Sequence, residues 1–526
     1  MAAGRVGKIE QMKEKPASAF RVDASSQIGT GHFMRCLTLA DAMKQRGVQV
    51  CFVCRQLSEH LKGMLLIRGH ELVLLDGIRR DMFENSLAHA HWLGVSQEQD
   101  AEDTIKRLSG RIWDWIVVDH YALDCRWEKL LRKTAKKVMV IDDIADRKHD
   151  CDVLLDQNFY SDMDTRYTDK VPEHCRLLLG PRYALLRDEF RKKREQVKPR
   201  NGPVERVFVF FGGVDVENYT KCTIDVLSGL DLSDIHVDVV IGAQHPFREQ
   251  IESACALYKF SCHVQTDKIA ELMAQADLAI GAGGAATWER CCLGLPTLVI
   301  GTADNQKRQI ADAARDGLIY SPDLTDELIH TMNRHIVAFM ENRFLRFAIS
   351  RKDMKSVDGL GTERVIRKLK LPSMEESFEG LVNVRLAVAE DAMIAWSWRN
   401  NEATRRYFFE QSPVGLETHL AWWKRSLSNP QCVLLVGKMG DKDVGVIRYD
   451  LINARQAKVS IYLNPEITGL GVGKRLLKVS RDWLLRNHPE IETVIAEILL
   501  DNVSSLKAFR AVGFQEQHIV LLWEGN

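Results

Sequence analysis

Short apolar runs alternate with amphipathic, helix-like stretches along the first two thirds of the chain, and this alternation restricts the possible folds more than any other feature. From residue 19 the strand-like runs are FRVDAS, VQVCFVCR, HELVLLD, WIVVDHY, KVMVIDD and CDVLLDQ, with segments such as HFMRCLTLADAMKQRG between several of them. Alternation of this kind predicts a parallel sheet that is flanked by helices.

A basic, polar stretch at 187–206, with two prolines and a glycine, interrupts the pattern and predicts a domain boundary. The alternation then restarts with VERVFVFFGG, HVDVVIG, SCHVQT, DLAIGAGG and TLVIG. The sequence therefore predicts two α/β units in tandem. Such units leave a cleft between them, and ligands of open α/β sheets usually bind at such a place.

The last third of the chain has a different character. Helical sequence fills about 306–370, and LPSMEESFEGLVN then reads as a linker. Six strand-like runs follow with few helices between them: VNVRLA, QCVLLVGK, VGVIRYDL, AKVSIYL, TVIAEILL and HIVLLW. This pattern predicts an α+β domain with a mostly meandering sheet. We expect an α/β chain with domains at 19–190, 203–370 and 382–526.

Composition excludes several classes of partner and site. Lys and Arg number 72 and so do Asp and Glu, so charge gives no reason to expect nucleic acid or an anionic membrane as a partner. No stretch approaches the roughly 20 apolar residues of a membrane helix, and the polar start lacks the apolar core of a signal peptide. The single C-x-x-C, Cys51 and Cys54, lies in a strand that points them to opposite faces, and no second pair completes a zinc site. We expect reduced cysteines in a cytoplasmic protein.

A glycine loop with a histidine follows the first strand. Gly29 and Gly31 bracket Thr30, and His32 comes next, at the start of a helix. Glycines let the backbone approach a ligand, a helix N-terminus favours an anion, and a neutral imidazole can take a proton from water near pH 7. A glycine turn with a helix-capping histidine is the plain alternative. Met34 replaces the third glycine of G-x-G-x-x-G, which disfavours a dinucleotide site.

Two other predicted strands in this half end in polar residues. Asp119, His120 and Tyr121 close WIVVDHY, and Asp142 and Asp143 close KVMVIDD. Both groups point toward the same predicted cleft. Polar residues at strand ends are also common as simple turn residues.

The second unit has two glycine-rich strand ends. Gly212 and Gly213 follow a strongly apolar strand, and Gly281, Gly283 and Gly284 precede a helix that starts near residue 285. Free amides at such places can hold phosphate groups, so these segments predict a pyrophosphate site.

Two further groups of polar residues complete this predicted site. Glu289 lies one turn into the helix. A carboxylate there can accept hydrogen bonds from two hydroxyls of a ribose, or it can simply complement the helix dipole. Asp304, Asn305 and Gln306 end the strand TLVIG and could hold a sugar.

Five ordered segments, SSQIGTGHFMR, VVDHYALD, FFGGVD, GAGGAATWER and GLPTLVIGTADNQ, together resemble the UDP-sugar hydrolases of pseudaminic acid biosynthesis over about residues 19–370. That family cleaves UDP-2,4-diacetamido-2,4,6-trideoxy-β-L-altropyranose and belongs to the GT-B group. The resemblance implies two Rossmann-like domains in a GT-B arrangement and hydrolysis without a metal. It also implies that His32 activates the attacking water, that Tyr121 and Asn305 line the sugar, and that Glu289 binds the ribose.

A second glycine loop lies in the last third. The run from Gly469 to Gly473 stands between a strand and an amphipathic helix, so the amides of Leu470, Gly471, Val472 and Gly473 could cradle a pyrophosphate, with Lys474 adding charge. Further on come a strand, Asn502, a short helix and Gly513-Phe514. In this order the segments resemble the acetyl-CoA-binding core of the GNAT superfamily, which implies acetyl-CoA as a cosubstrate for 382–526.

Some residues of this domain depart from the superfamily pattern. Thr468 stands where Gln or Arg is frequent, and Phe509 stands where a tyrosine often protonates the departing thiolate. Glu497 lies where such enzymes keep a base, and an exposed strand carboxylate is its plain alternative. Arg399 lies in a W-R-N segment similar to acetyltransferases of amino-sugar nucleotides, where it could meet a phosphate or face solvent.

The sequence thus predicts a bifunctional enzyme that N-acetylates a UDP-4-amino-4,6-dideoxy sugar and hydrolyses the resulting UDP-diacetamido-trideoxy sugar. The expected partners are UDP-sugars, with no nucleic acid, no membrane and no metal. The alternative is a GT-B glycosyltransferase that uses a UDP-sugar, with the GNAT domain acting as an acetyl-CoA sensor.

Overall fold

The protein divides into two compact units, Met1–Leu371 and Pro372–Asn526. The computed structural model describes residues 15–25, 27–77, 87–230, 232, 234–302, 306–323, 327–371, 382–440, 442–467, 471–499 and 501–516. Asn305, Leu470 and the predicted strand HIVLLW lie outside these described residues.

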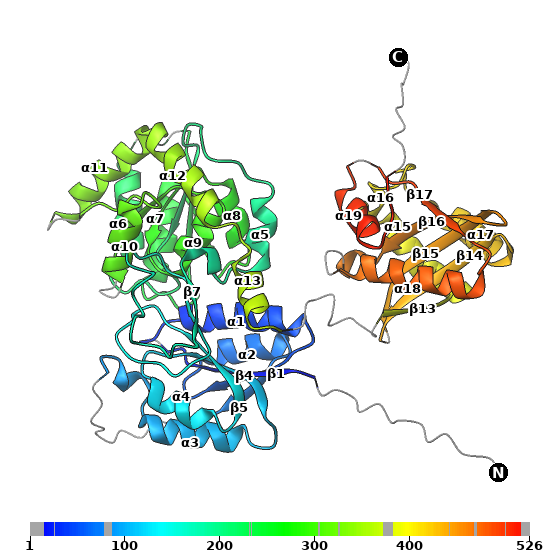
Figure 1. The fold of residues 1–526 in the computed structure, drawn as a ribbon. Helices are drawn as coiled ribbons and strands as arrows, with labels where there is room; N and C mark the ends of the chain where they lie inside the picture. The colour runs from blue at the N-terminus through cyan, green and yellow to red at the C-terminus, as the bar shows by residue number, and fades with distance from the viewer. Residues whose placement is uncertain are drawn as a thin grey trace, which may run out of the picture. The chain divides into compact units, whose positions relative to one another are not determined.

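The first half of the first unit is built on a parallel sheet with the strand order β3-β2-β1-β4-β5-β6-β7 (Figure 1). The elements are β1 (Ala17–Val22), α1 (Gly31–Lys44), β2 (Gln49–Cys54), α2 (Glu59–Ile67), β3 (Glu71–Leu74), η1 (Ala90–Trp92), α3 (Gln97–Arg107), β4 (Trp113–Asp119), α4 (Cys125–Leu131), β5 (Ala135–Ile141), β6 (Val153–Asp156), β7 (Arg176–Leu179) and η2 (Pro181–Tyr183). The four-residue strand β7 was not among the predicted strands.

The strands read as continuous apolar runs because both faces of this sheet are buried. Phe20 and Phe52 stack at 5.2 Å in the core on one face, whereas Ala19 and Val53 belong to the core on the other. Cys51 and Cys54 fall in different cores, which confirms that they point to opposite faces. All twelve cysteines are unpaired.

The second half repeats the plan with a smaller parallel sheet in the order β10-β9-β8-β11-β12. Its elements are α5 (Asp188–Arg194), β8 (Arg206–Phe210), α6 (Tyr219–Ser228), β9 (His236–Ile241), α7 (Arg248–Tyr258), β10 (Ser261–Val264), α8 (Ile269–Gln275), β11 (Leu278–Ala282), α9 (Ala285–Cys292), β12 (Thr297–Ile300), α10 (Lys307–Arg315), α11 (Leu328–Glu341), α12 (Arg343–Ser356) and α13 (Gly361–Lys368).

The chain crosses between the two halves twice. Phe190 of α5 is buried in the core of the second half. Helix α13 returns to the first half, where Val365, Ile366 and Leu369 join the same core as Phe33 of α1, and Figure 1 shows α13 beside α1. These crossings tie the two sheets into one unit.

The C-terminal unit has one mixed sheet in the order β13-β14-β15-β16-β17. Neighbouring strands are antiparallel except β16 and β17, which are parallel. The elements are β13 (Val382–Leu386), η4 (Ala389–Asp391), α15 (Ala392–Asn400), α16 (Glu402–Arg405), α17 (Leu416–Ser428), β14 (Cys432–Met439), β15 (Lys442–Asn453), β16 (Gln456–Leu463), η5 (Pro465–Ile467), α18 (Val472–Asn487), β17 (Thr493–Ala496) and α19 (Val503–Ala511).

The predicted α/β fold class, with two Rossmann-like domains in a GT-B arrangement followed by an α+β domain, is confirmed. In the described part of the chain, no helix has the length and apolar character to cross a bilayer.

Candidate active sites

The strand order of the first sheet reverses direction between β1 and β4, which are direct neighbours at its centre. Loops that leave the carboxyl ends of such a strand pair diverge and open a crevice for ligands. The loop after β1 leads to His32 at the start of α1, and β4 ends at Asp119. The topology therefore brings together two side chains that are 87 residues apart.

His32 is held by a buried carboxylate. Its Nδ1 lies 2.5 Å from Oδ1 of Asp119, whose side chain is fully buried, whereas the His32 side chain remains 11% exposed. Arg35 donates from Nε and Nη2 to the two oxygens of Asp119 at 2.6 and 2.7 Å. Burial alone would raise the pKa of Asp119, but the charges of Arg35 and His32 outweigh it and hold that pKa well below its usual range.

This geometry fixes the tautomer of the imidazole. Nη2 of Arg35 also lies 3.1 Å from Nδ1 of His32. A guanidinium can only donate, so this contact is a hydrogen bond only if Nδ1 carries no proton. The shorter contact is to the carboxylate, which can only accept, so Nδ1 carries the proton. Nε2 of His32 is then left with a lone pair that can accept a proton from a ligand or a water.

Aromatic rings surround the histidine. Tyr121 meets His32 edge-on at 4.6 Å between ring centroids, Trp92 stacks on Tyr121 at 5.5 Å, and His89 lies 4.4 Å from Trp92. Burial raises the pKa of Tyr121, so its hydroxyl stays protonated and donates to Asp143. Sequence reasoning found Tyr121 but missed Trp92 and His89, because their segment has neither a glycine loop nor a strand end.

The structure does not bring His120 and Asp142 to the histidine. His120 is buried against Asp23, with Nε2 3.2 Å from the carboxylate. Asp142 pairs with Arg147 at 2.9 Å, and the pKa of Asp142 is about 2 because this pairing and other hydrogen bonds outweigh its burial. Both residues stabilise the strand ends internally, so our expectation that they face the cleft was wrong.

The second half places glycines at the corresponding strand ends. A side chain at Gly281 would put its Cβ 2.1 Å from the carbonyl oxygen of Phe210 on the neighbouring strand, so only glycine fits there. Gly212 and Gly284 have φ of +100° and +84°, and Gly284 caps the start of α9. Gly213 is open on its side-chain face. These glycines leave room for a ligand to approach the backbone at the helix start.

Glu289 lies on the first turns of α9 with 18% of its side chain exposed. Its Oε1 accepts from Nη2 of Arg187 at 3.2 Å. Burial raises the pKa of Glu289, and the charge of Arg187 opposes that shift. The carboxylate is therefore held in place through Oε1.

One buried amide connects the two halves near these sites. Nδ2 of Asn158, in the loop after β6, donates to Oδ2 of Asp143 at 3.2 Å. Its Oδ1 accepts from Nε1 of Trp288 on α9 at 2.8 Å and from Nε2 of Gln309 on α10 at 3.2 Å. Asp143 also accepts from Arg35, so a continuous polar chain runs from His32 to the helix that carries Glu289.

In the C-terminal unit, a glycine also begins the helix of the predicted cofactor loop. Gly471 has φ of +74° and caps α18, Val472 is buried, and a Cβ at Gly473 would lie 3.2 Å from Leu463. Lys474 follows in the first turn of α18. Asn502 caps α19, where its Oδ1 accepts from the amide of Ser505 at 3.1 Å.

Strands β16 and β17 separate near this loop. Their pairing ends at Val459 and Ala496, while β16 continues to Leu463 beside β15 alone. Phe509 is buried in the core and packs on Phe514 at 4.9 Å. Its role in the described part of the domain is therefore packing.

A pocket of about 440 Å³ lies on the face of this sheet opposite to the one on which Phe509 packs. Arg399 lines it with its guanidinium 3.8 Å from the ring of Phe408 and with Nη2 donating to the carbonyl of Glu410 at 2.7 Å. Sequence reasoning identified only Arg399 among the residues that line the pocket. The lining residues are Arg399, Phe408, Glu410, Val414, Thr418, His419, Trp422, Arg425, Leu434, Val446, Arg448, Ser460 and Tyr462.

Glu497 is not one of these lining residues. It is 54% exposed and forms a 2.7 Å ion pair with Lys458. Because Lys458 alternates along β16 with Ser460 and Tyr462, these three side chains share one face of the strand. The ion pair therefore places Glu497 at the pocket face of the sheet, beyond the pocket itself.

Within the described ranges, no three His, Cys, Asp or Glu side chains converge as metal ligands.

Sequence relatives cover both units. Residues 382–515 match the family model of the acetyltransferase (GNAT) domain. The chain is 26% identical over 263 residues to the UDP-2,4-diacetamido-2,4,6-trideoxy-beta-L-altropyranose hydrolase of Campylobacter jejuni, which covers 50% of this chain and 82% of that relative.

Two other relatives extend the comparison. The spore coat polysaccharide biosynthesis protein SpsG of Bacillus subtilis is 24% identical over 355 residues, covering 65% of this chain and 94% of SpsG. Uncharacterized protein MJ1062 of Methanocaldococcus jannaschii is 20% identical over 509 residues, covering 95% of this chain and 96% of that relative. The chain is therefore a fusion of a region homologous to the Campylobacter hydrolase and SpsG with a C-terminal GNAT acetyltransferase domain.

Proposed function

We propose that this chain is a cytoplasmic, bifunctional enzyme of nonulosonic (pseudaminic) acid biosynthesis. Its C-terminal domain uses acetyl-CoA to N-acetylate a UDP-4-amino-4,6-dideoxy sugar. Its first unit hydrolyses the UDP-diacetamido-trideoxy sugar to free sugar and UDP without a metal. The relatives named above support the two chemistries, and the arrangement of His32 supports the hydrolytic one.

The observation that carries the proposal is the pair formed by His32 and Asp119. The 2.5 Å contact fixes the proton on Nδ1, and we assign Nε2 as the base at the carboxyl ends of β1 and β4. In the proposed reaction Nε2 takes a proton from water while the water oxygen bonds to the anomeric carbon. The bond between that carbon and the β-phosphate oxygen breaks, and UDP departs with the electron pair.

The second half of the unit supplies the site for the leaving group. The amides at the start of α9 and the open backbone at Gly212 and Gly213 suit the negative charge that develops on the pyrophosphate. Glu289, fixed by Arg187, suits the ribose hydroxyls. We assign Tyr121 and Asn305 to the sugar, and Gly31 and Gly284 to the backbone contacts of the substrate.

In the acetyltransferase domain, we assign the amides of Leu470, Gly471, Val472 and Gly473, together with Lys474 and Asn502, to acetyl-CoA. The pocket that Arg399 lines then receives the amino-sugar nucleotide, because it joins cationic side chains to an aromatic wall. The sugar amine attacks the thioester carbonyl, and its proton passes to Glu497, directly or through water. Phe509 cannot protonate the departing thiolate, so Ser505, a water or the product ammonium supplies that proton, or the thiolate leaves unprotonated.

One reaction series tests this proposal. The full chain is incubated in chelator with acetyl-CoA and a UDP-4-amino-4,6-dideoxy sugar, and the products are followed by mass spectrometry. We expect an acetylated nucleotide sugar first and then free diacetamido sugar and UDP in equal amounts. If UDP forms only after a sugar acceptor is added, the chain is a glycosyltransferase. If acetyl-CoA is bound but never consumed, the GNAT domain is an acetyl-CoA sensor.

A further inference from the structure

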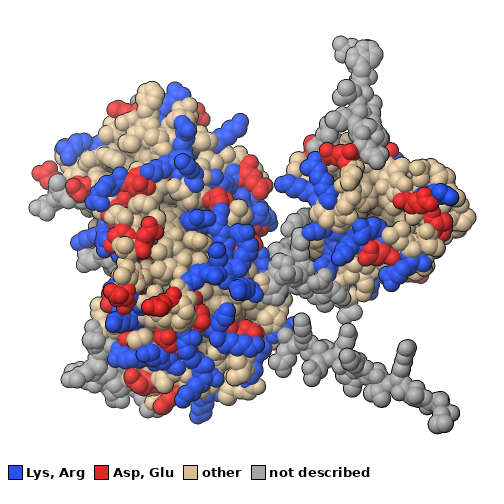
Figure 2. All heavy atoms as spheres, in the orientation of Figure 1, with Lys and Arg blue, Asp and Glu red and all other residues tan. Residues whose placement is uncertain are grey.

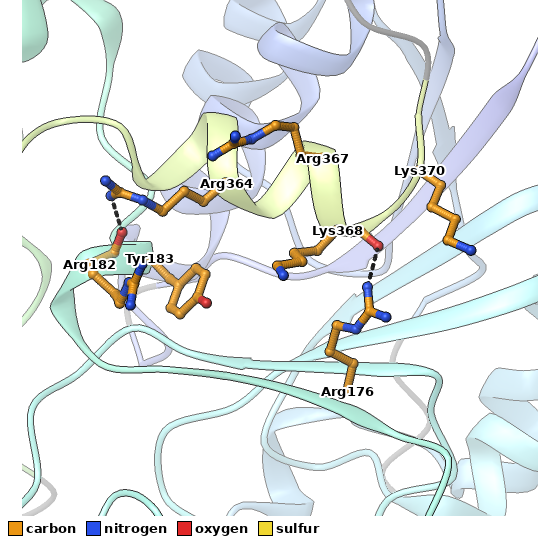
Figure 3. Close-up of a pocket in the computed structure, with 7 residues that line it drawn as sticks. All are labelled: Arg176, Arg182, Tyr183, Arg364, Arg367, Lys368 and Lys370. Atoms are coloured by element: carbon orange, nitrogen blue, oxygen red, sulfur yellow. Dashed lines mark hydrogen bonds between the residues drawn. The ribbon is translucent and has the colours of Figure 1, made fainter.

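One cavity in the first unit is lined almost entirely by cations. It measures about 380 Å³ and lies where α13 passes over β7 and η2 (Figure 3). We call it the basic pocket. Its lining residues are Arg176, Arg182, Tyr183, Arg364, Arg367, Lys368 and Lys370.

Two segments that are far apart in sequence build this pocket. The apolar side of α13, with Val365, Ile366 and Leu369, packs into the core of the first half. Arg364, Arg367 and Lys368 are therefore left on its outer side. Arg176 and Arg182, from β7 and η2, face the same hollow, and Figure 3 shows Arg176 reaching up to the end of α13. These two arginines, which come from β7 and η2, distinguish the cavity from the solvent-exposed basic face of a single helix.

Most of this charge is not neutralised. Arg364 pairs with Asp358 and donates to the carbonyl of Arg182 at 2.8 Å. Arg176 donates to the carbonyl of Lys368 at 3.5 Å. Within the described parts of the chain, no carboxylate pairs with Arg176, Arg182, Arg367, Lys368 or Lys370.

The gathering of charge is local. Lys and Arg equal Asp and Glu over the whole chain, yet Figure 2 shows Lys and Arg side chains clustered over the region where α13 lies. A hollow lined by one sign of charge focuses the field and concentrates counter-ions. Guanidinium groups match the oxygens of phosphate in pairs, and Tyr183 offers the single aromatic ring of the lining.

We propose that the basic pocket binds an oligophosphate, either inorganic or as the phosphate chain of a nucleotide. This site is separate from the cleft that holds His32 and α9, and it does not depend on the proposed reactions. Its occupant bridges α13 to β7 and η2. Because α13 packs on α1, the occupant also stabilises the packing of α13 against the first half.

The test uses sodium tripolyphosphate as the probe and the full chain at low salt. Calorimetric titration gives the affinity of the wild type, of the double variant Arg367→Glu/Lys370→Glu, and of a matched control, Lys106→Glu/Lys129→Glu. All four residues are exposed, so each double variant makes the same change of charge on the surface of the same half. A thermal scan with and without the probe reports folding and stabilisation in parallel.

We expect the wild type to bind the probe and to melt at a higher temperature with it. The pocket variant should lose about 10-fold or more in affinity and the thermal shift, while the control retains both. Equal affinity in the pocket variant, or an equal loss in the control, would overturn the proposal.

A second arm identifies the source of the phosphate chain. UTP replaces tripolyphosphate in a Glu289→Ala background, which removes the proposed ribose contact in the cleft. Affinity equal to that for tripolyphosphate assigns the site to inorganic chains. Tighter binding that Tyr183→Ala abolishes assigns it to a nucleotide. Hydrolysis is measured separately, so loss of the proposed reaction and loss of this site cannot be confused.

Discussion

At the scale of single residues, the first unit contains buried charged pairs that hold structure and one histidine, His32, that we propose as a general base. Asp119 is fully buried and bound by both Arg35 and His32, so it remains a carboxylate. Nδ1 of His32 contacts that carboxylate, so Nε2 is the nitrogen that we propose as the base. A carboxylate that orients a histidine without exchanging its own proton is a recurrent way to prepare a general base.

The sequence pointed to both His32 and Asp119 but did not pair them. His32 follows a glycine loop, a local signal that can be read in the chain. Asp119 becomes its partner because β1 and β4 are neighbours, which no local pattern reveals. Arg35, three residues after His32 on α1, contacts both His32 and Asp119. Trp92 and His89 come from a segment with no recognised motif, so only the tertiary fold brings them near.

Glu289→Ala should weaken UDP binding more than it slows turnover at saturation. The proposed hydroxyl contacts are equal in the ground and transition states, so their loss raises KM and leaves kcat nearly unchanged. Steady-state kinetics of UDP release, with direct titration of UDP, measure both quantities. An unchanged affinity for UDP would remove Glu289 from the ribose site.

Asp142 should contribute stability that depends on pH. Its pKa in the folded protein is about 2, below its ordinary value of 3.8, so this stability is present above about pH 4 and is lost as pH falls toward 2. The shift corresponds to about 2 kcal/mol. Urea unfolding should show that Asp142→Asn is less stable by about this amount at pH 7, with a gap that narrows below pH 4.

The control for this prediction is Asp164→Asn, which changes an exposed carboxylate. It should be indistinguishable from the wild type at both pH values. A gap for Asp142→Asn that stays constant from pH 7 to pH 2 would contradict the assigned role of its charge.

At the scale of helices and strands, the regular alternation of the sequence was enough to predict both parallel sheets. The run of strands in the last third predicted a mostly meandering sheet, and the parallel pairing of β16 with β17 was not predicted. The short edge strand β7 was missed because its four residues lie in a long irregular stretch. The sequence also did not reveal that α13 packs in the core of the first half. Its apolar face predicts burial, but nothing in the sequence says against which half it packs.

Asn158 provides a test of the connection between elements of the two halves. Asn158→Ala leaves the indole N–H of Trp288 buried without a partner, which costs about 2 kcal/mol. We expect lower stability of the first unit and slower UDP release, because α9 and the network around Asp143 lose their common contact. Unfolding and kinetic measurements on the same variant give both effects.

A double-mutant cycle supplies the control. Trp288→Phe removes the donor that Asn158 satisfies, so adding Asn158→Ala to it should cost less than Asn158→Ala alone. Strict additivity of the two substitutions would show that the bridge does not couple α9 to the first half.

At the scale of the whole molecule, the fusion joins two proposed steps in which the product of one is the substrate of the other. The two units have separate cores, and the loop that we assign to acetyl-CoA belongs to the second unit. Nothing in the chemistry of either step requires a residue of the other unit. We therefore expect the activities to be separable by substitution.

Gly471→Glu should abolish acetyl-CoA binding and acetylation while hydrolysis of a pre-acetylated substrate continues. Gly471 has a positive φ at the start of α18, so a side chain is strained there and a negative charge would oppose the pyrophosphate. Acetyl-CoA titration and UDP release are measured on the same preparation. Loss of hydrolysis in a folded variant would mean that the units depend on each other.

The most direct test of the account is the release of UDP by wild type and His32→Ala. Both are given UDP-2,4-diacetamido-2,4,6-trideoxy sugar in chelator with no acceptor, and acetylation is measured in parallel. We expect release by the wild type, a loss of about 100-fold or more in the variant, and unchanged acetylation. Near-normal release by His32→Ala would contradict this expectation, because His32 could not then be the base.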